Sequence, residues 1–220
     1  MLNQTIHYLP IFPLPRVVLF PRTRIPLHIF EPRYRKMVAD CLNKDRRLGI
    51  VQLRHGNRRD AAEDNPPVFR VLTIGRIVFE RKLEDGKYDI LVEGHERARI
   101  ISEVIHQPYR IAKQISLQEF IEPNSPRELQ RAASDMLQLV RELGEKYPRA
   151  RRSLKSILSA YTHPGIIADL IAYQFVSQPY DQQCILEELN VIRRVQLVSV
   201  QLHMLLAQLA NLPQIENNAE

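Results

Sequence analysis

The chain has 220 residues, a length typical of one large or two small domains. Hydrophobic residues make up 45% and charged residues 25%, which fits a globular protein and excludes a disordered or collagen-like chain. No stretch approaches the ~20 consecutive apolar residues of a membrane-spanning helix, and the N-terminus lacks the basic and apolar regions of a signal peptide. We therefore expect a cytoplasmic protein that does not associate with membranes.

The formal net charge of +6 is unevenly distributed. Through Phe120 there are 21 Lys and Arg against 14 Asp and Glu, whereas from Ile121 onward there are 10 against 11. A moderate surplus of this kind favours a solubilising surface, but it leaves attraction to acidic proteins or nucleic acid open.

The first 120 residues predict short strands and one helix. Between Ile11 and Val38 the apolar residues form short runs bounded by prolines, which suit edge strands and turns, and a helix is predicted from Pro32 to Leu42. Asp85-Gly86 predicts a hairpin turn, and the polar residues at 54–67 predict an exposed loop. Segments rich in β-branched residues predict strands at 48–53, 68–83, 88–94, 98–105 and 109–117.

The remaining residues predict helices. Ser125-Pro126-Arg127-Glu128 has the form of a capping box with proline at the first helical position, and apolar residues follow at helical spacing. Asn190 is predicted to cap a long last helix, whose apolar residues either pack on the preceding helices, which we favour, or form a coiled-coil dimer contact. The other predicted helices span 149–161, 164–177 and 182–189.

These patterns predict an α+β fold. We expect a β-rich domain at 1–120, a helical domain at 121–212 and a flexible tail at 213–220.

The opening segment from Leu9 to Val38, LPIFPLPRVVLFPRTRIPLHIFEPRYRKMV, resembles the start of the Lon protease N-terminal substrate-binding (LON) domain family. That family has L-P-L-F-P-L, V-L-F-P-G and P-L-H-I-F-E-P-R-Y in this order, and Arg22 stands where its members usually have glycine. Later matches are Ile74-Gly75-Arg76-Ile77, Asp85-Gly86-Lys87-Tyr88, Val92-Glu93-Gly94 with Arg97, Pro164-Gly165 with Ala168-Asp169, and Gln183 to Leu189. The resemblance implies an N-terminal PUA-like pseudo-β-barrel followed by a C-terminal helical bundle with a long last helix.

The sequence offers no catalytic, cofactor or metal motif. Its seven glycines leave no G-x-x-x-x-G-K-[ST] phosphate loop, and its histidines and cysteines lack metal-binding spacing. Ser153 and Lys155 lie among arginines on a face that we expect to be solvated, so they do not predict a Ser-Lys dyad. Cys41 and Cys184 are predicted to be buried free thiols. We therefore expect a free-standing LON domain without the ATPase and protease of the full enzyme, with no enzymatic activity, no cofactor and no bound metal.

The resemblance implies a module that binds unfolded or hydrophobic polypeptide segments, for delivery to a protease or chaperone, through an apolar groove or a sheet edge. We expect it to be a monomer or a weak homodimer. The alternative is a PUA-like RNA-binding protein that uses the basic N-terminal half to contact phosphates. The candidate binding residues are the aromatic Phe20, Phe30, Tyr34 and Phe79 and the basic Arg33, Arg35 and Arg76. For each residue taken singly, packing in the core or simple surface exposure is the competing explanation.

Overall fold

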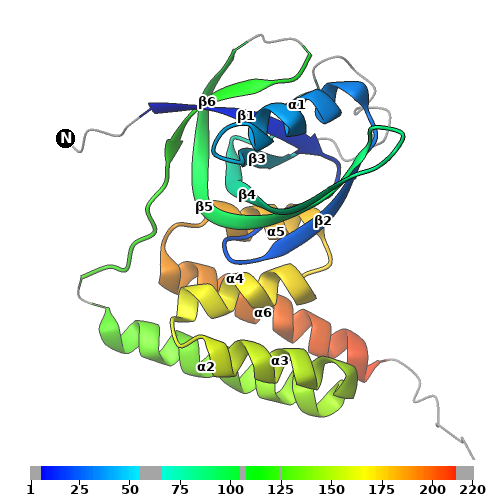
Figure 1. The fold of residues 1–220 in the computed structure, drawn as a ribbon. Coiled ribbons are helices and arrows are strands. Elements are labelled where there is room, and N and C mark those ends of the chain that lie inside the picture. Colours follow the sequence, from blue (N-terminus) through cyan, green and yellow to red (C-terminus); the bar gives the residue numbers. More distant parts are fainter. Residues whose placement is uncertain (1–5, 55–65, 105–107, 124, 212–220) are drawn as a thin grey trace, which may run out of the picture. The chain divides into compact units, whose positions relative to one another are not determined.

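The computed structural model describes residues 6–54, 66–104, 108–123 and 125–211 (Figure 1). Contacts between Cα atoms divide the chain into two compact units. The first unit comprises Met1–Phe120 and Ser177–Leu189, and the second comprises Ile121–Val176 and Asn190–Glu220. The predicted loop at 54–67 and the predicted tail at 213–220 lie largely or wholly outside the described residues.

The first unit is built on one six-stranded sheet with the strand order β2-β5-β4-β3-β1-β6. Neighbouring strands are antiparallel except β1 and β3, which are parallel. The strands are β1 (Ile6–Leu14), β2 (Arg24–Ile29), β3 (Arg47–Gln52), β4 (Val71–Lys82), β5 (Tyr88–Val104) and β6 (Ile111–Ser116). The unit also contains α1 (Pro32–Leu42) and α5 (Pro179–Glu187).

The sheet closes on itself because β5 also pairs with β6. The sequence predicted two strands here, at 88–94 and 98–105, but β5 runs through the polar residues between them. Glu96 and Arg97 pair with Ile74 and Thr73 of β4, and a register shift beside Gly75 accommodates the extra residue. The prediction of a break was wrong because a polar run in a strand resembles a turn when only local pattern is considered.

A close approach of two backbones explains one glycine of the family pattern. A Cβ atom at Gly94 would collide with the carbonyl of Phe20, so only glycine fits there. The amide of Arg22 donates to the carbonyl oxygen of Gly94 at 2.7 Å, and Arg22 itself has a φ of 66°. This left-handed conformation suits glycine, which accounts for the usual residue at that position; here an arginine adopts the same turn.

Two buried apolar clusters lie among the described residues of the first unit. In the larger one, α1 contributes Tyr34, Met37, Val38 and Cys41, all on the helix face that the spacing predicted. The helix begins at Pro32, whose missing amide hydrogen needs no partner in the first turn. The sequence predicted the bounds of this helix, Pro32 to Leu42, correctly.

The helix α5 belongs to the first unit, which differs from the expected continuous helical domain at 121–212. The side-chain amide of Gln183 donates to the carbonyl of Val71 at 3.0 Å. The buried guanidinium of Arg97 donates through Nε to the carbonyl of Leu186 at 2.9 Å. These long-range bonds attach α5 to β4 and β5, and no local pattern at 177–189 could reveal them.

The second unit consists of α2 (Pro126–Lys146), α3 (Pro148–Ala160), α4 (Pro164–Phe175) and α6 (Val191–Ala210). Asn190 caps α6 as predicted, because its side-chain oxygen accepts from the amides of Ile192 and Arg193. The predicted capping box is wrong in its side-chain part, because Ser125 makes no side-chain cap bond to the start of α2. One apolar face of α6 packs inside the unit, with Val191, Val195, Val198, Leu202 and Leu206 buried, whereas Leu197, Val200 and Met204 are exposed.

A buried ion pair lies within the second unit. Nε of Arg194 on α6 lies 3.1 Å from Oδ1 of Asp169 on α4, and both side chains are almost fully buried. A Cβ atom at Gly165 would meet the guanidinium of Arg194 at 2.6 Å, so the glycine leaves room for it. Two matches to the family pattern, Pro164-Gly165 and Ala168-Asp169, are therefore explained by the same buried arginine: Asp169 pairs with Arg194, and Gly165 leaves room for it.

We expect Asp169→Asn to lower the free energy of unfolding by about 3–5 kcal/mol, because it removes the carboxylate charge that faces the buried guanidinium of Arg194. Urea denaturation followed by circular dichroism measures this. Asp135→Asn, an exposed change on α2, serves as the control and should change the free energy by no more than about 0.5 kcal/mol. Equal effects of the two substitutions would contradict the importance of the pair.

The two cysteines differ in exposure. Cys41 is buried in the larger cluster, and its burial raises the pKa of the thiol to about 12. Cys184 is exposed, so the prediction that both thiols are buried was wrong for Cys184. A short local pattern could not show this, because the exposed side of α5 depends on where the helix packs.

Because thiolates are the reactive form, we expect a thiol reagent at about pH 8 to modify one thiol in the folded protein and two after unfolding. In the Cys184→Ser variant the folded protein should show no fast-reacting thiol. Mass spectrometry of the labelled protein identifies the site. Rapid labelling of Cys41 in the folded protein would contradict its burial.

Candidate functional site

The first unit contains a groove at the ends of β1 and β2 and at the start of α1. Its volume is about 270 Å³. Most of the residues that line it are apolar: Phe12, Pro13, Leu14, Pro15, Leu27, Phe30, Tyr34, Leu53 and Pro66, with His28, Glu31, Arg33 and Arg110 as the polar members. We call this the apolar groove.

Phe30 is the most accessible aromatic side chain of the apolar groove, with 59% of its surface exposed. It follows directly after β2, where alternation turns Ile29 into the core and leaves Phe30 outside. Its ring stacks on His28 with a centroid separation of 6.4 Å. Nδ1–H of His28 donates a hydrogen bond to the Asp89 carboxylate at 2.7 Å. This bond and a second one from Arg81 lower the pKa of Asp89. The rim of the groove at β2 is therefore held in place.

The opposite wall comes from the first turn of α1. Nε of Arg33 donates to Glu31 at 2.9 Å, and the guanidinium lies 4.7 Å above the ring of Tyr34. The Tyr34 ring packs at 4.3 Å from that of Phe12. Burial raises the pKa of Tyr34, with the neighbouring Arg33 acting in the opposite direction. The wall thus combines an aromatic surface with one ion pair.

Of the seven candidates from the sequence, the apolar groove brings together Phe30, Arg33 and Tyr34. Phe20 is fully buried in the core and offers no surface to a ligand, so we withdraw it. Arg35 lies on α1 beside a neighbouring pocket. Arg76 and Phe79 are exposed on β4 and do not line the groove.

Sequence reasoning missed several lining residues that come from distant segments. Leu14 and Leu27 lie on β1 and β2, Leu53 follows β3, and Arg110 precedes β6. The guanidinium of Arg110 is held by Glu103 at 2.6 Å and by the carbonyl of Pro66 at 2.8 Å. Only the long-range strand pairing brings these residues together.

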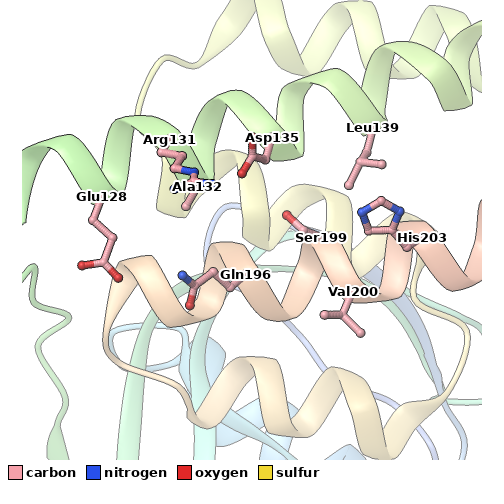
Figure 2. A pocket seen from close by; sticks show the side chains of 9 residues that line it. All are labelled: Glu128, Arg131, Ala132, Asp135, Leu139, Gln196, Ser199, Val200 and His203. Carbon is pink, nitrogen blue, oxygen red and sulfur yellow. The ribbon is translucent and has the colours of Figure 1, made fainter.

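A second hollow lies between α2 and α6 in the second unit, with a volume of about 410 Å³ (Figure 2). Figure 2 shows the side chains of Glu128 and Gln196 entering the space between the two helices. Six of its nine lining residues are polar or charged: Glu128, Arg131, Asp135, Gln196, Ser199 and His203. We therefore assign the candidate site for apolar groups to the groove of the first unit.

The described residues contain no cluster of three or more His, Cys, Asp or Glu side chains that could hold a metal ion. The hydroxyl of Ser153 is hydrogen-bonded to the side chain of Gln174 at 2.8 Å, whereas Lys155 is exposed. This arrangement offers no activated serine. Among the described helices, none has the length and apolar character needed to cross a membrane.

Two solved structures share the fold of this chain. The N-terminal domain of a Mycobacterium avium complex Lon protease aligns with a TM-score of 0.68 at 16% identity, over 90% of this chain and 98% of that one. A Lon N-terminal domain protein from Xanthomonas campestris aligns with a TM-score of 0.58 at 18% identity, over 94% of this chain and 99% of that one. The α+β fold predicted from the sequence is confirmed.

Sequence comparison defines the family. The family described as the ATP-dependent protease La (LON) substrate-binding domain matches residues 8–203. Lon protease 2 of Sorangium cellulosum is 31% identical over 196 residues, covering 86% of this chain and 24% of the relative. Lon protease 2 of Myxococcus xanthus is 27% identical over 190 residues, covering 86% and 23%. The chain belongs to the LON substrate-binding domain family, and it spans about a quarter of the length of these relatives.

The exposure of Phe30 and Phe79 predicts how removal of each side chain affects stability. We expect Phe30→Ala and Phe79→Ala each to change the free energy of unfolding by less than about 0.5 kcal/mol, because 59% and 55% of their surfaces are exposed. Phe12→Ala should lower it by about 3–5 kcal/mol, because this side chain is buried. Thermal and urea denaturation measure these changes. A large loss for Phe30→Ala would show that Phe30 supports the fold and is not simply a surface contact.

Proposed function

We propose that the chain is a non-catalytic recognition module whose apolar groove binds bulky apolar side chains of exposed polypeptide segments. The observation that carries this proposal is the exposure of Phe30 beside a concave, mostly apolar surface. An exposed apolar surface that is concave and has a few polar groups at its rim is typical of a binding site.

The size of the apolar groove favours a side chain over a free small molecule. Ligand pockets for small molecules typically have volumes of about 300–1,000 Å³, and the groove has about 270 Å³. Its surface is shaped by aromatic rings and prolines, which lose little conformational entropy when a partner packs on them. The ligand class that fits is one or two apolar side chains presented by an extended or unfolded chain.

The family membership supports the same class of ligand, because the matching family is described as a substrate-binding domain. We propose that the module hands such segments to a protease or chaperone. The relatives that carry the name Lon protease support a protease as the recipient.

Binding of RNA through the basic half is the weaker candidate. Several arginines of the first unit are paired with carboxylates, which reduces the local positive field. The pairs are Arg24 with Glu93, Arg47 with Glu96, Arg81 with Asp89 and Arg110 with Glu103. We therefore favour polypeptide over nucleic acid.

The test uses fluorescence anisotropy with a labelled Gly/Ser-rich peptide that carries one central Phe, and a second peptide with Ala in its place. We expect the Phe peptide to bind more tightly and Phe30→Ala to weaken its binding about tenfold, the loss of roughly 1.4 kcal/mol of apolar contact. Phe79→Ala is the matched control, since it removes an equally exposed phenylalanine from outside the groove. Equal weakening by the two variants, or tight binding of single-stranded RNA in place of both peptides, would refute the proposal.

A further inference from the structure

The first turn of α1 separates the apolar groove from a second pocket of the same unit. Arg33 and Tyr34 face the groove, whereas Pro32, Arg35 and Lys36 face the other pocket. This pocket has a volume of about 330 Å³ and is completed by Lys82, Gly86 and Tyr88 from the hairpin of β4 and β5. We call it the basic pocket.

The basic pocket contains two cationic side chains that form no ion pair among the described residues. Lys36 is bonded to Asp40, and the nearby Asp85 is bonded to Lys87 at 2.6 Å. The charge of Arg35 also acts on Asp85 and helps to lower the pKa of this carboxyl group, but less than the bonds from Lys87 do. Arg35 and Lys82 form no ion pair within the described part of the chain; Nζ of Lys82 lies 5.8 Å above the Tyr88 ring. Two cations therefore remain available to an anion.

The turn at Gly86 maintains the space in which Arg35 lies. Gly86 has a φ of 78°, a conformation that suits glycine, and a Cβ atom there would displace the end of the Arg35 side chain from its present position. The sequence predicted this glycine for the hairpin turn alone. In the structure its missing side chain also leaves room for the Arg35 guanidinium beside the turn.

Because the two pockets contact different residues of the first turn of α1, we take the width of a helix as the distance that a peptide must cross between them. An α-helix with its side chains is about 10–12 Å across, and an extended chain advances about 3.3 Å per residue. A peptide that crosses the first turn of α1 therefore passes from one pocket to the other in three to four residues. The width of the helix therefore sets the spacing between the side chain that a peptide places in the groove and the one that it places in the basic pocket.

We propose that the apolar groove and the basic pocket form one bipartite site, which selects segments with a bulky apolar side chain and an Asp or Glu three to four residues away. This inference rests on the proposed function and adds the carboxylate to the ligand. The carboxylate binds Arg35 and Lys82, while the apolar side chain contacts Phe30. Arg35, a candidate from the sequence, thus acts in the basic pocket and not in the groove.

The test compares two labelled peptides that share a central Phe and differ only in Glu or Gln three residues away. We expect the wild-type protein to bind the Glu peptide about fivefold more tightly at low salt, and this preference to shrink as salt screens the charges. The double variant Arg35→Gln/Lys82→Gln should bind the two peptides equally, with the affinity of the wild type for the Gln peptide. Anisotropy titrations measure all four affinities.

The control is Arg76→Gln/Arg99→Gln, which removes the same net charge from exposed positions of the same unit outside both pockets. It should retain the preference for Glu. A preference that survives in Arg35→Gln/Lys82→Gln, or that disappears equally in the control, would overturn the bipartite site while leaving groove binding intact. If neither peptide bound the wild type, the proposed function itself would fail. Displacement of the Glu peptide by single-stranded RNA, dependent on Arg35 and Lys82, would identify a general polyanion site instead and overturn the inference.

Discussion

The pairing of β5 with three other strands is the constraint on which the first unit depends. Seventeen residues of one strand hydrogen-bond β2 and β4 along its first half and β4 and β6 along its second. A strand that serves both ends of a sheet must bend, and the register shifts beside Gly75 and after Ile100 supply the bend. The backbone of Phe20 approaches Gly94 at this strand, so the turn that follows β1 is fixed to it as well.

The candidate site depends on this arrangement because β2 pairs with β5 alone. The position of Leu27, His28 and Phe30 is therefore set by the register of one strand pair, and Asp89 of β5 holds His28 from the other side. The remaining walls are short segments at strand ends and the first turn of α1. The sheet thus supports a surface formed by strand ends, short connecting segments and the first turn of α1.

The sequence pattern correctly predicted those features that depend on neighbouring residues, such as helix faces and helix caps. The spacing of Tyr34, Met37 and Cys41 defined the buried face of α1, and Asn190 was a sufficient signal for the cap of α6. Phe20 and Phe30 could not be told apart in this way, since both are aromatic residues in similar proline-bounded runs. Their exposures of 0% and 59% follow from long-range packing. The grouping of Leu53 and Arg110 with Phe30 likewise required the sheet topology.

The attachment of α5 to β4 and β5 has a consequence for how the chain can be divided. The backbone passes from the first unit to the second, returns at Ser177–Leu189, and then leaves again. Neither unit is a continuous stretch, so no single cut releases one of them whole. A fragment ending at Phe120 would lack Leu186, whose carbonyl oxygen accepts a hydrogen bond from the guanidinium of Arg97. The two units therefore alternate along the sequence, and a truncation at any point between residues 121 and 188 removes part of both.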